Sequence, residues 1–85
     1  MTDNKSTERS LYDDHHILKM IGDKVRAIRK NHPDYANYEV FAYFNQINKV
    51  TLSNIEKGEN YNISSLLKVI NALGVSVEDF FNGIK

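Results

Sequence analysis

The sequence contains no cysteine, no tryptophan, one proline and four glycines among its 85 residues. Without cysteine, the chain can form neither a disulfide bond nor a thiolate zinc site. No apolar run approaches the roughly 20 residues that a membrane-spanning helix needs, so we expect no membrane association. Residues 1–10 also lack the apolar core of a signal peptide. Together these absences predict a cytoplasmic protein.

The chain has no excess of either charge, because it contains 11 basic and 11 acidic side chains. Proteins that bind nucleic acid usually carry a basic surface, so the overall balance argues mildly against that function. The field at a contact surface depends on nearby charges, however, since distant ones are screened over about 10 Å at ordinary salt. Composition therefore leaves a local nucleic-acid contact open.

The chain also lacks the residue groupings that catalysis needs. It has no cysteine nucleophile, no glycine-rich phosphate loop and no convincing acid–base pair, so we expect no catalytic residue and no cofactor. The run Asp13-Asp14-His15-His16 resembles a metal cluster, but adjacent residues on a helix point in different directions. We interpret it as an acidic helix start followed by solvated histidines, and we expect no metal site.

Apolar spacing predicts an all-α fold of five helices, with no strand, in a domain spanning residues 11–85. Residues 1–10 are polar and are expected to form a mobile tail. A first long helix starts near Asp13 or Asp14 and ends before Pro33. The later helices, with their capping residues, are predicted at 38–45 after Asn37, 48–57 between Asn48 and Gly58, 63–73 after Asn62, and 77–82 after Ser76.

The same spacing predicts which apolar side chains form the core. In helix order, the predicted core residues are Ile17, Leu18, Ile21, Val25 and Ile28; Val40, Phe41 and Phe44 around the small Ala42; Leu52 and Ile55; Ile63, Leu66, Leu67, Ile70 and Leu73; and Val77, Phe80 and Phe81.

The third helix, residues 48–57, has an outward face that suits a DNA major groove. Leu52 and Ile55 point inward, which leaves Lys49, Val50, Ser53 and Asn54 outside. Lysine and asparagine can hydrogen-bond base edges, and valine can contact a thymine methyl group. The alternative is an ordinary amphipathic helix on a small bundle.

Taken together, the helices resemble the lambda-repressor-like, Cro/repressor (XRE-type) helix-turn-helix family over about residues 20–82. The resemblance rests on IGDKVRAIRK (21–30), Phe41-Ala42, TLSNIEKG (51–58) and, most specifically, LLKVINALGVSVEDFF (66–81). It implies that residues 48–57 enter the major groove, with Lys49, Val50 and Asn54 as base contacts and Ser53 at the margin.

The resemblance also implies an ion pair between Arg29 and Glu56, which would fix the third helix. The family usually carries glycine in the turn between the second and third helices, where this chain has Gln46. That turn often needs a positive φ, which glutamine tolerates poorly.

Contacts to DNA phosphates need hydrogen-bond donors on both sides of the third helix. Helix N-termini and flanking loops provide the candidates, which are Asn37, Tyr38, Asn48, Lys57, Asn60 and Tyr61.

These features predict a sequence-specific, double-stranded DNA-binding transcriptional regulator that acts as a homodimer. Two apolar groups could form the dimer or could belong to the core: Leu11 and Tyr12, or Phe80, Phe81 and Ile84. The alternative function is a protein-interaction module on the same fold, such as an antitoxin that masks a toxin. Contact with RNA polymerase is a further possible protein interaction.

Overall fold

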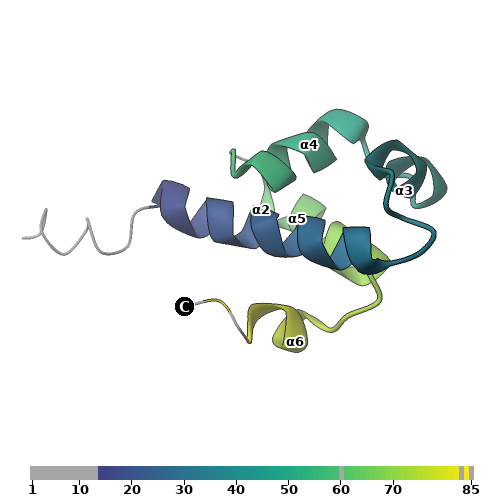
Figure 1. The fold of residues 1–85 in the computed structure, drawn as a ribbon. Helices are drawn as coiled ribbons and strands as arrows, with labels where there is room; N and C mark the ends of the chain where they lie inside the picture. The colour runs from purple at the N-terminus through teal and green to yellow at the C-terminus, as the bar shows by residue number, and fades with distance from the viewer. Residues whose placement is uncertain (1–13, 60, 83, 85) are drawn as a thin grey trace, which may run out of the picture.

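The computed structural model describes residues 14–59, 61–82 and 84, and the regular structure within these ranges is entirely helical. The five helices are α2 (Asp14–Asn31), α3 (Tyr38–Phe44), α4 (Lys49–Lys57), α5 (Ile63–Ala72) and α6 (Val77–Phe81), drawn in Figure 1. The all-α prediction is confirmed, and the predicted boundaries agree to within one or two residues. The expected mobile tail, residues 1–10, lies outside the described residues.

Each of the last four helices begins at a side chain that accepts hydrogen bonds from its first turn. The Asn48 carboxamide oxygen accepts from the backbone N–H groups of Val50 (2.9 Å) and Thr51 (3.1 Å). Asn37, Asn62 and Ser76 cap α3, α5 and α6 in the same way. These four predicted caps are confirmed. Capping depends on a short stretch of sequence, which is why it could be predicted from the sequence alone.

The helices surround one apolar core. Its most deeply buried members come from all five helices and include Val25, Phe41, Leu52, Ile55, Leu66, Val69, Ile70 and Phe80. Ile28, Val75, Phe81 and Ile84 are partly buried against this core. The predicted inward positions of Leu52 and Ile55 are confirmed.

Six predicted core residues are exposed instead: Ile17, Val40, Phe44, Ile63, Leu67 and Val77. On α5 the buried stripe runs through Leu66, Val69 and Ile70, so it is turned away from Ile63 and Leu67. On α3 only Phe41 and Ala42 are buried. A seven-residue helix that meets the domain along one side has no second side to bury, which leaves Phe44 outside.

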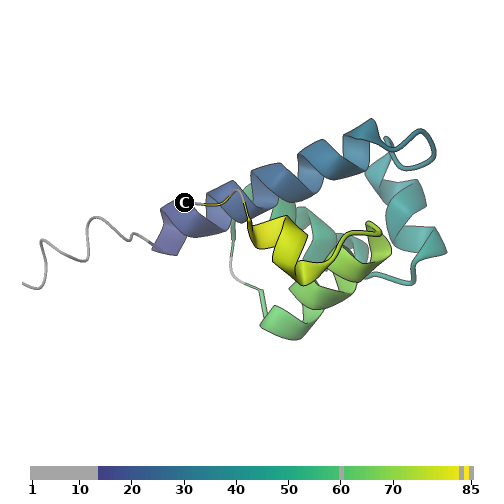
Figure 2. The same cartoon turned by 90° about the horizontal axis from the view of Figure 1, so that it is seen from below.

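The long helix α2 runs the length of the domain, with α4 along one side and α6 on another (Figure 1). Helix α3 lies at the end of the domain where α2 ends, and it packs against α4. Figure 2 shows α5 and α6 side by side below α2. This arrangement places α3 and α4 together, and both α2 and α5 pack against α4.

Candidate nucleic-acid interface

Helices α3 and α4 are joined by a tight turn in which Gln46 adopts a positive φ of 55°. The Gln46 N–H donates to the Tyr43 carbonyl oxygen (3.2 Å), and the Ile47 N–H donates to the Ala42 carbonyl oxygen (2.8 Å). This pair of hydrogen bonds defines the Schellman ending of a helix, in which glycine usually takes the left-handed position. The positive φ expected at Gln46 is therefore present.

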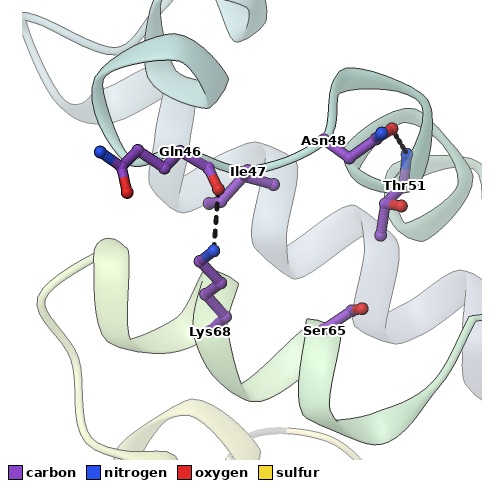
Figure 3. Close-up of a pocket in the computed structure, with 6 residues that line it drawn as sticks. All are labelled: Gln46, Ile47, Asn48, Thr51, Ser65 and Lys68. Carbon is purple, nitrogen blue, oxygen red and sulfur yellow. Dashed lines mark hydrogen bonds between the residues drawn. The ribbon is translucent and has the colours of Figure 1, made fainter.

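A side chain of α5 stabilises this turn from the neighbouring helix. The Lys68 ammonium group donates to the Gln46 carbonyl oxygen at 2.8 Å, as Figure 3 shows. Both residues line a small pocket of about 240 Å³ with Asn48, Thr51 and Ser65. The turn is thus held by its own hydrogen bonds and by a charged donor from α5.

The inner side of α4 lies directly on the backbone of α2. A Cβ atom on Gly22 would overlap the Ile55 carbonyl oxygen and lie 2.8 Å from that of Glu56. At the end of α4, Gly58 has a φ of 78°, and a Cβ there would lie 2.8 Å from the Lys19 Cα atom. Two glycines, one within α2 and one directly after α4, therefore permit this close approach.

Arg29, a residue only 3% exposed, connects three parts of the candidate interface through its guanidinium group. Its Nε and Nη2 atoms donate to the two carboxylate oxygens of Glu56 at 2.7 and 3.0 Å. Its Nη1 atom donates to the carbonyl oxygens of Tyr35 (3.0 Å) and Ala36 (2.7 Å). Arg29 and Glu56 thus pair as expected, and the same arginine also fixes the loop that leads into α3.

The four expected base contacts lie next to one another on the outer side of α4. Lys49 and Val50 are exposed, while Ser53 and Asn54 are half-buried. Their spacing of three and four residues makes them neighbours on the helix surface. The Lys49 ammonium nitrogen lies 3.4 Å from a carboxylate oxygen of Glu39 on α3, so an acid accompanies this cation.

The expected phosphate contacts differ in their exposure to solvent. Asn37, Tyr38, Asn48 and Lys57 are exposed around α3 and α4, whereas Asn60 lies outside the described residues. The structure counts against Tyr61, because its hydroxyl oxygen is buried and has no hydrogen-bond partner within the described part of the chain. Burial also raises the pKa of the Tyr61 hydroxyl. Tyr61 packs its ring against the core and cannot donate to a phosphate from this position.

The expected dimer residues at the C-terminus belong to the core of their own chain. Phe80 is 1% exposed, so of its two expected roles, dimer contact or core, the structure supports the core. Phe81 and Ile84 are partly buried against the same core. Leu11 and Tyr12 lie outside the described residues.

Two residues of this interface were not singled out from the sequence. Gly22 could have been, because glycine within a helix is unfavourable and often has a packing reason. The role of Lys68 gives no local signal, since it depends on how α5 lies beside the turn. The close approach of α2 and α4 and the support of the turn thus come from tertiary structure.

No helix within residues 14–59, 61–82 and 84 is long and apolar enough to cross a membrane. No group of three or more potential metal-ligating side chains is found among those residues. Comparisons of the chain with protein-family models, with curated proteins and with solved structures found no match.

Proposed function

We propose that this chain is a sequence-specific, double-stranded DNA-binding transcriptional regulator of the Cro/repressor (XRE-type) helix-turn-helix kind. One observation carries the proposal. Helix α4 is held on its inner side by α2 and by the Arg29–Glu56 pair, while its outer side presents Lys49, Val50, Ser53 and Asn54. A rigidly held helix with an outward polar face is what insertion into a major groove requires.

The outer side chains of α4 suit particular base edges. Lys49 matches the acceptor atoms of guanine, Asn54 matches adenine, and Val50 matches a thymine methyl group. Ser53 can hydrogen-bond to several bases and therefore adds less discrimination. A well-formed pairing of this kind contributes about 1–3 kcal/mol of preference over the wrong base.

The affinity is expected to depend only weakly on salt. Of the exposed residues proposed to contact DNA, Lys49 and Lys57 alone are cations, and Lys49 already has Glu39 beside it. Each neutralised phosphate contributes about −0.9 to the log–log slope of affinity against salt, so we expect a slope of roughly −2. A slope several times steeper would contradict this set of contacts.

The test begins with fluorescence polarisation of a labelled random-sequence duplex at low salt. Binding in the micromolar range, roughly 1–100 μM, is expected for non-specific contacts. Selection from a random pool then identifies the preferred sequence. On that sequence Asn54→Ala should weaken binding about tenfold, whereas Asn71→Ala, a matched change on the exposed side of α5, should have no effect. No binding at roughly 500 μM protein, well above this range, would overturn the proposal.

A second candidate is a protein-interaction module, of which an antitoxin is one form. The exposed apolar side chains of α3 favour it, because Tyr43 and Phe44 are 79% and 70% exposed. Such surface is typical of protein contacts and has no clear use against phosphates. The two functions are compatible, since these side chains are not among the proposed base contacts.

A further inference from the structure

Two exposed cations of α2 lie in a row that begins where α2 meets α4. Arg26 and Lys30, here called the α2 row, are both exposed. Gly22, Arg26 and Lys30 follow one another at intervals of four residues, so they are neighbours along the surface of the helix. A Cβ atom on Gly22 would meet the backbone of Ile55 and Glu56. The α2 row therefore continues directly from the contact between the two helices.

The α2 row lies beside α4 on the side away from the core. Val25, the residue before Arg26, is fully buried, whereas Arg29 reaches α4 through Glu56. Successive residues of a helix are turned by about 100°, so the order around α2 runs from Val25 to Arg29 and then to Arg26. The core, the contact with α4 and the α2 row thus follow one another around α2.

Helix α4 is arranged in the matching order. Leu52 is buried in the core, and Glu56 binds Arg29. Ser53 and Lys57 come next around the helix, beyond Glu56 and away from the core. Ser53 is a proposed base contact and Lys57 a proposed phosphate contact, so the α2 row adjoins the proposed DNA-binding side of α4.

The charge of the α2 row is not neutralised by the ion pairs of the described residues. Those pairs join Lys19 to Asp23, Arg29 to Glu56, and Lys49 to Glu39. The acidic first turn of α6, which holds Glu78 and Asp79, belongs to a helix on the other side of α2 from α4 (Figure 1). A chain with no net charge therefore has a basic edge beside α4.

We infer that Arg26 and Lys30 bind backbone phosphates of DNA when the outer side of α4 lies in the major groove. The inference rests on the proposed function. A helix with its side chains is about 10–12 Å across and the groove is about 12 Å wide, so a sugar–phosphate backbone runs along each flank of an inserted helix. An arginine can bind a phosphate with two parallel hydrogen bonds, and a lysine binds it as a point charge. Such contacts position the protein without reading the sequence.

The salt dependence of the wild-type protein separates this inference from the smaller set of contacts. Lys49 and Lys57 alone give a log–log slope of roughly −2, and two further neutralised phosphates take the slope to roughly −4. Fluorescence polarisation on a random-sequence duplex between roughly 50 and 200 mM salt measures it. A slope that stays near −2 overturns the inference and leaves the proposed function intact, whereas no binding at roughly 500 μM protein overturns both.

Matched variants assign the extra slope to the α2 row. Arg26→Gln and Lys30→Gln should each flatten the slope by about 0.9 and weaken binding roughly fivefold to tenfold at about 0.1 M salt. Arg26→Lys keeps the charge and should keep the slope. Lys24→Gln is the control, because Lys24 lies on the α6 side of the same helix, 5.4 Å from the centre of the Phe80 ring. Equal flattening by Lys24→Gln overturns the inference.

The sequence being bound provides a second readout. Arg26→Gln should weaken binding by the same factor on the random-sequence duplex and on the selected sequence, because a phosphate contact is independent of the bases. Asn54→Ala should instead act mainly on the selected sequence. A loss from Arg26→Gln that is confined to the selected sequence overturns the phosphate assignment. Thermal melts check that each variant remains folded.

An acid beside the α2 row permits a test of opposite sign. Asp23 lies three residues before Arg26, and its carboxylate is 2.8 Å from the Lys19 ammonium nitrogen. Asp23→Asn removes a negative charge from this edge and frees Lys19, so it should strengthen binding roughly twofold to fivefold at low salt. Glu78→Gln, the same kind of change on α6, should have no effect. Equal strengthening by both variants overturns the inference, because net charge alone would then set the affinity.

Discussion

Helices α3 and α4 are neighbours with similar hydrogen-bonded ends, yet the domain holds them very differently. Helix α4 rests on the backbone of α2, buries Leu52 and Ile55, and ends at Gly58. Helix α3 buries two residues, exposes Tyr43 and Phe44, and ends at a glutamine in the left-handed conformation. The position of α4 is therefore strongly determined by its neighbours, while α3 is held by fewer buried side chains.

The largest expected effect comes from the ion pair that holds α4. Glu56→Ala leaves the Arg29 guanidinium buried without its carboxylate partner, which should cost about 3–5 kcal/mol of unfolding free energy. Urea denaturation followed by circular dichroism measures this change. DNA affinity should fall as well, because α4 loses its anchor.

The control for this prediction is the exposed pair between Lys19 and Asp23 on α2. Asp23→Ala should change the unfolding free energy by less than about 1 kcal/mol, since solvent screens that pair. An unchanged stability of the Glu56→Ala variant would count against a buried anchor.

The second effect concerns the close approach of α2 and α4. Alanine is normally favoured over glycine within a helix by about 1 kcal/mol. At Gly22, however, the added Cβ meets the backbone of Ile55 and Glu56, so Gly22→Ala should instead destabilise by about 3 kcal/mol.

The sign of this effect is checked on the exposed side of the same helix. Ala27→Gly should destabilise by about 1 kcal/mol, as helix propensity alone predicts. If Gly22→Ala stabilises the protein, α4 does not lie on α2 as closely as the structure places it.

The third comparison uses two glycines with nearly the same φ, 78° at Gly58 and 79° at Gly74. A Cβ at Gly58 would meet the backbone of Lys19, whereas a Cβ at Gly74 would meet no atom of the described residues within 4 Å. Gly74→Ala should therefore cost about 1 kcal/mol from conformation alone, and Gly58→Ala about 2 kcal/mol. Thermal unfolding of both variants gives the difference, and equal costs would remove the contact from the explanation.

These contrasts also explain which features were predictable from the sequence. The caps at Asn37, Asn48, Asn62 and Ser76 depend on two or three neighbouring residues, so local chemistry predicted them. The left-handed turn at Gln46 and the Arg29–Glu56 pair were expected from the family resemblance.

Features set by how helices meet were predicted less well. Periodicity shows that α5 has an apolar side, but not that Val69 is buried while Ile63 and Leu67 stay exposed. Tyr61 gives no local sign that its hydroxyl points inward, and the same is true of Phe44 pointing outward. Their environments depend on packing partners far away in the sequence.

The smallest expected effect returns to the turn between the two helices. At Gln46 the left-handed conformation costs a non-glycine residue about 1–2 kcal/mol, and a glycine would avoid this cost. Glycine is also more flexible in the unfolded chain, which offsets part of that gain in folding free energy. Gln46→Gly should therefore stabilise the protein by about 0.5–1 kcal/mol, which urea denaturation can resolve.

A matched variant separates backbone strain from any role of the amide. Gln46→Ala removes the amide but keeps the Cβ atom, so it should bring none of this gain. Equal stabilisation by alanine and glycine would show that the left-handed backbone is not the source. In either variant the Lys68 contact is preserved, because it is made to the backbone carbonyl oxygen of residue 46. If only the glycine variant gains stability, the turn after α3 is strained by its left-handed glutamine. Helix α4 avoids this strain because the residue that follows it is Gly58.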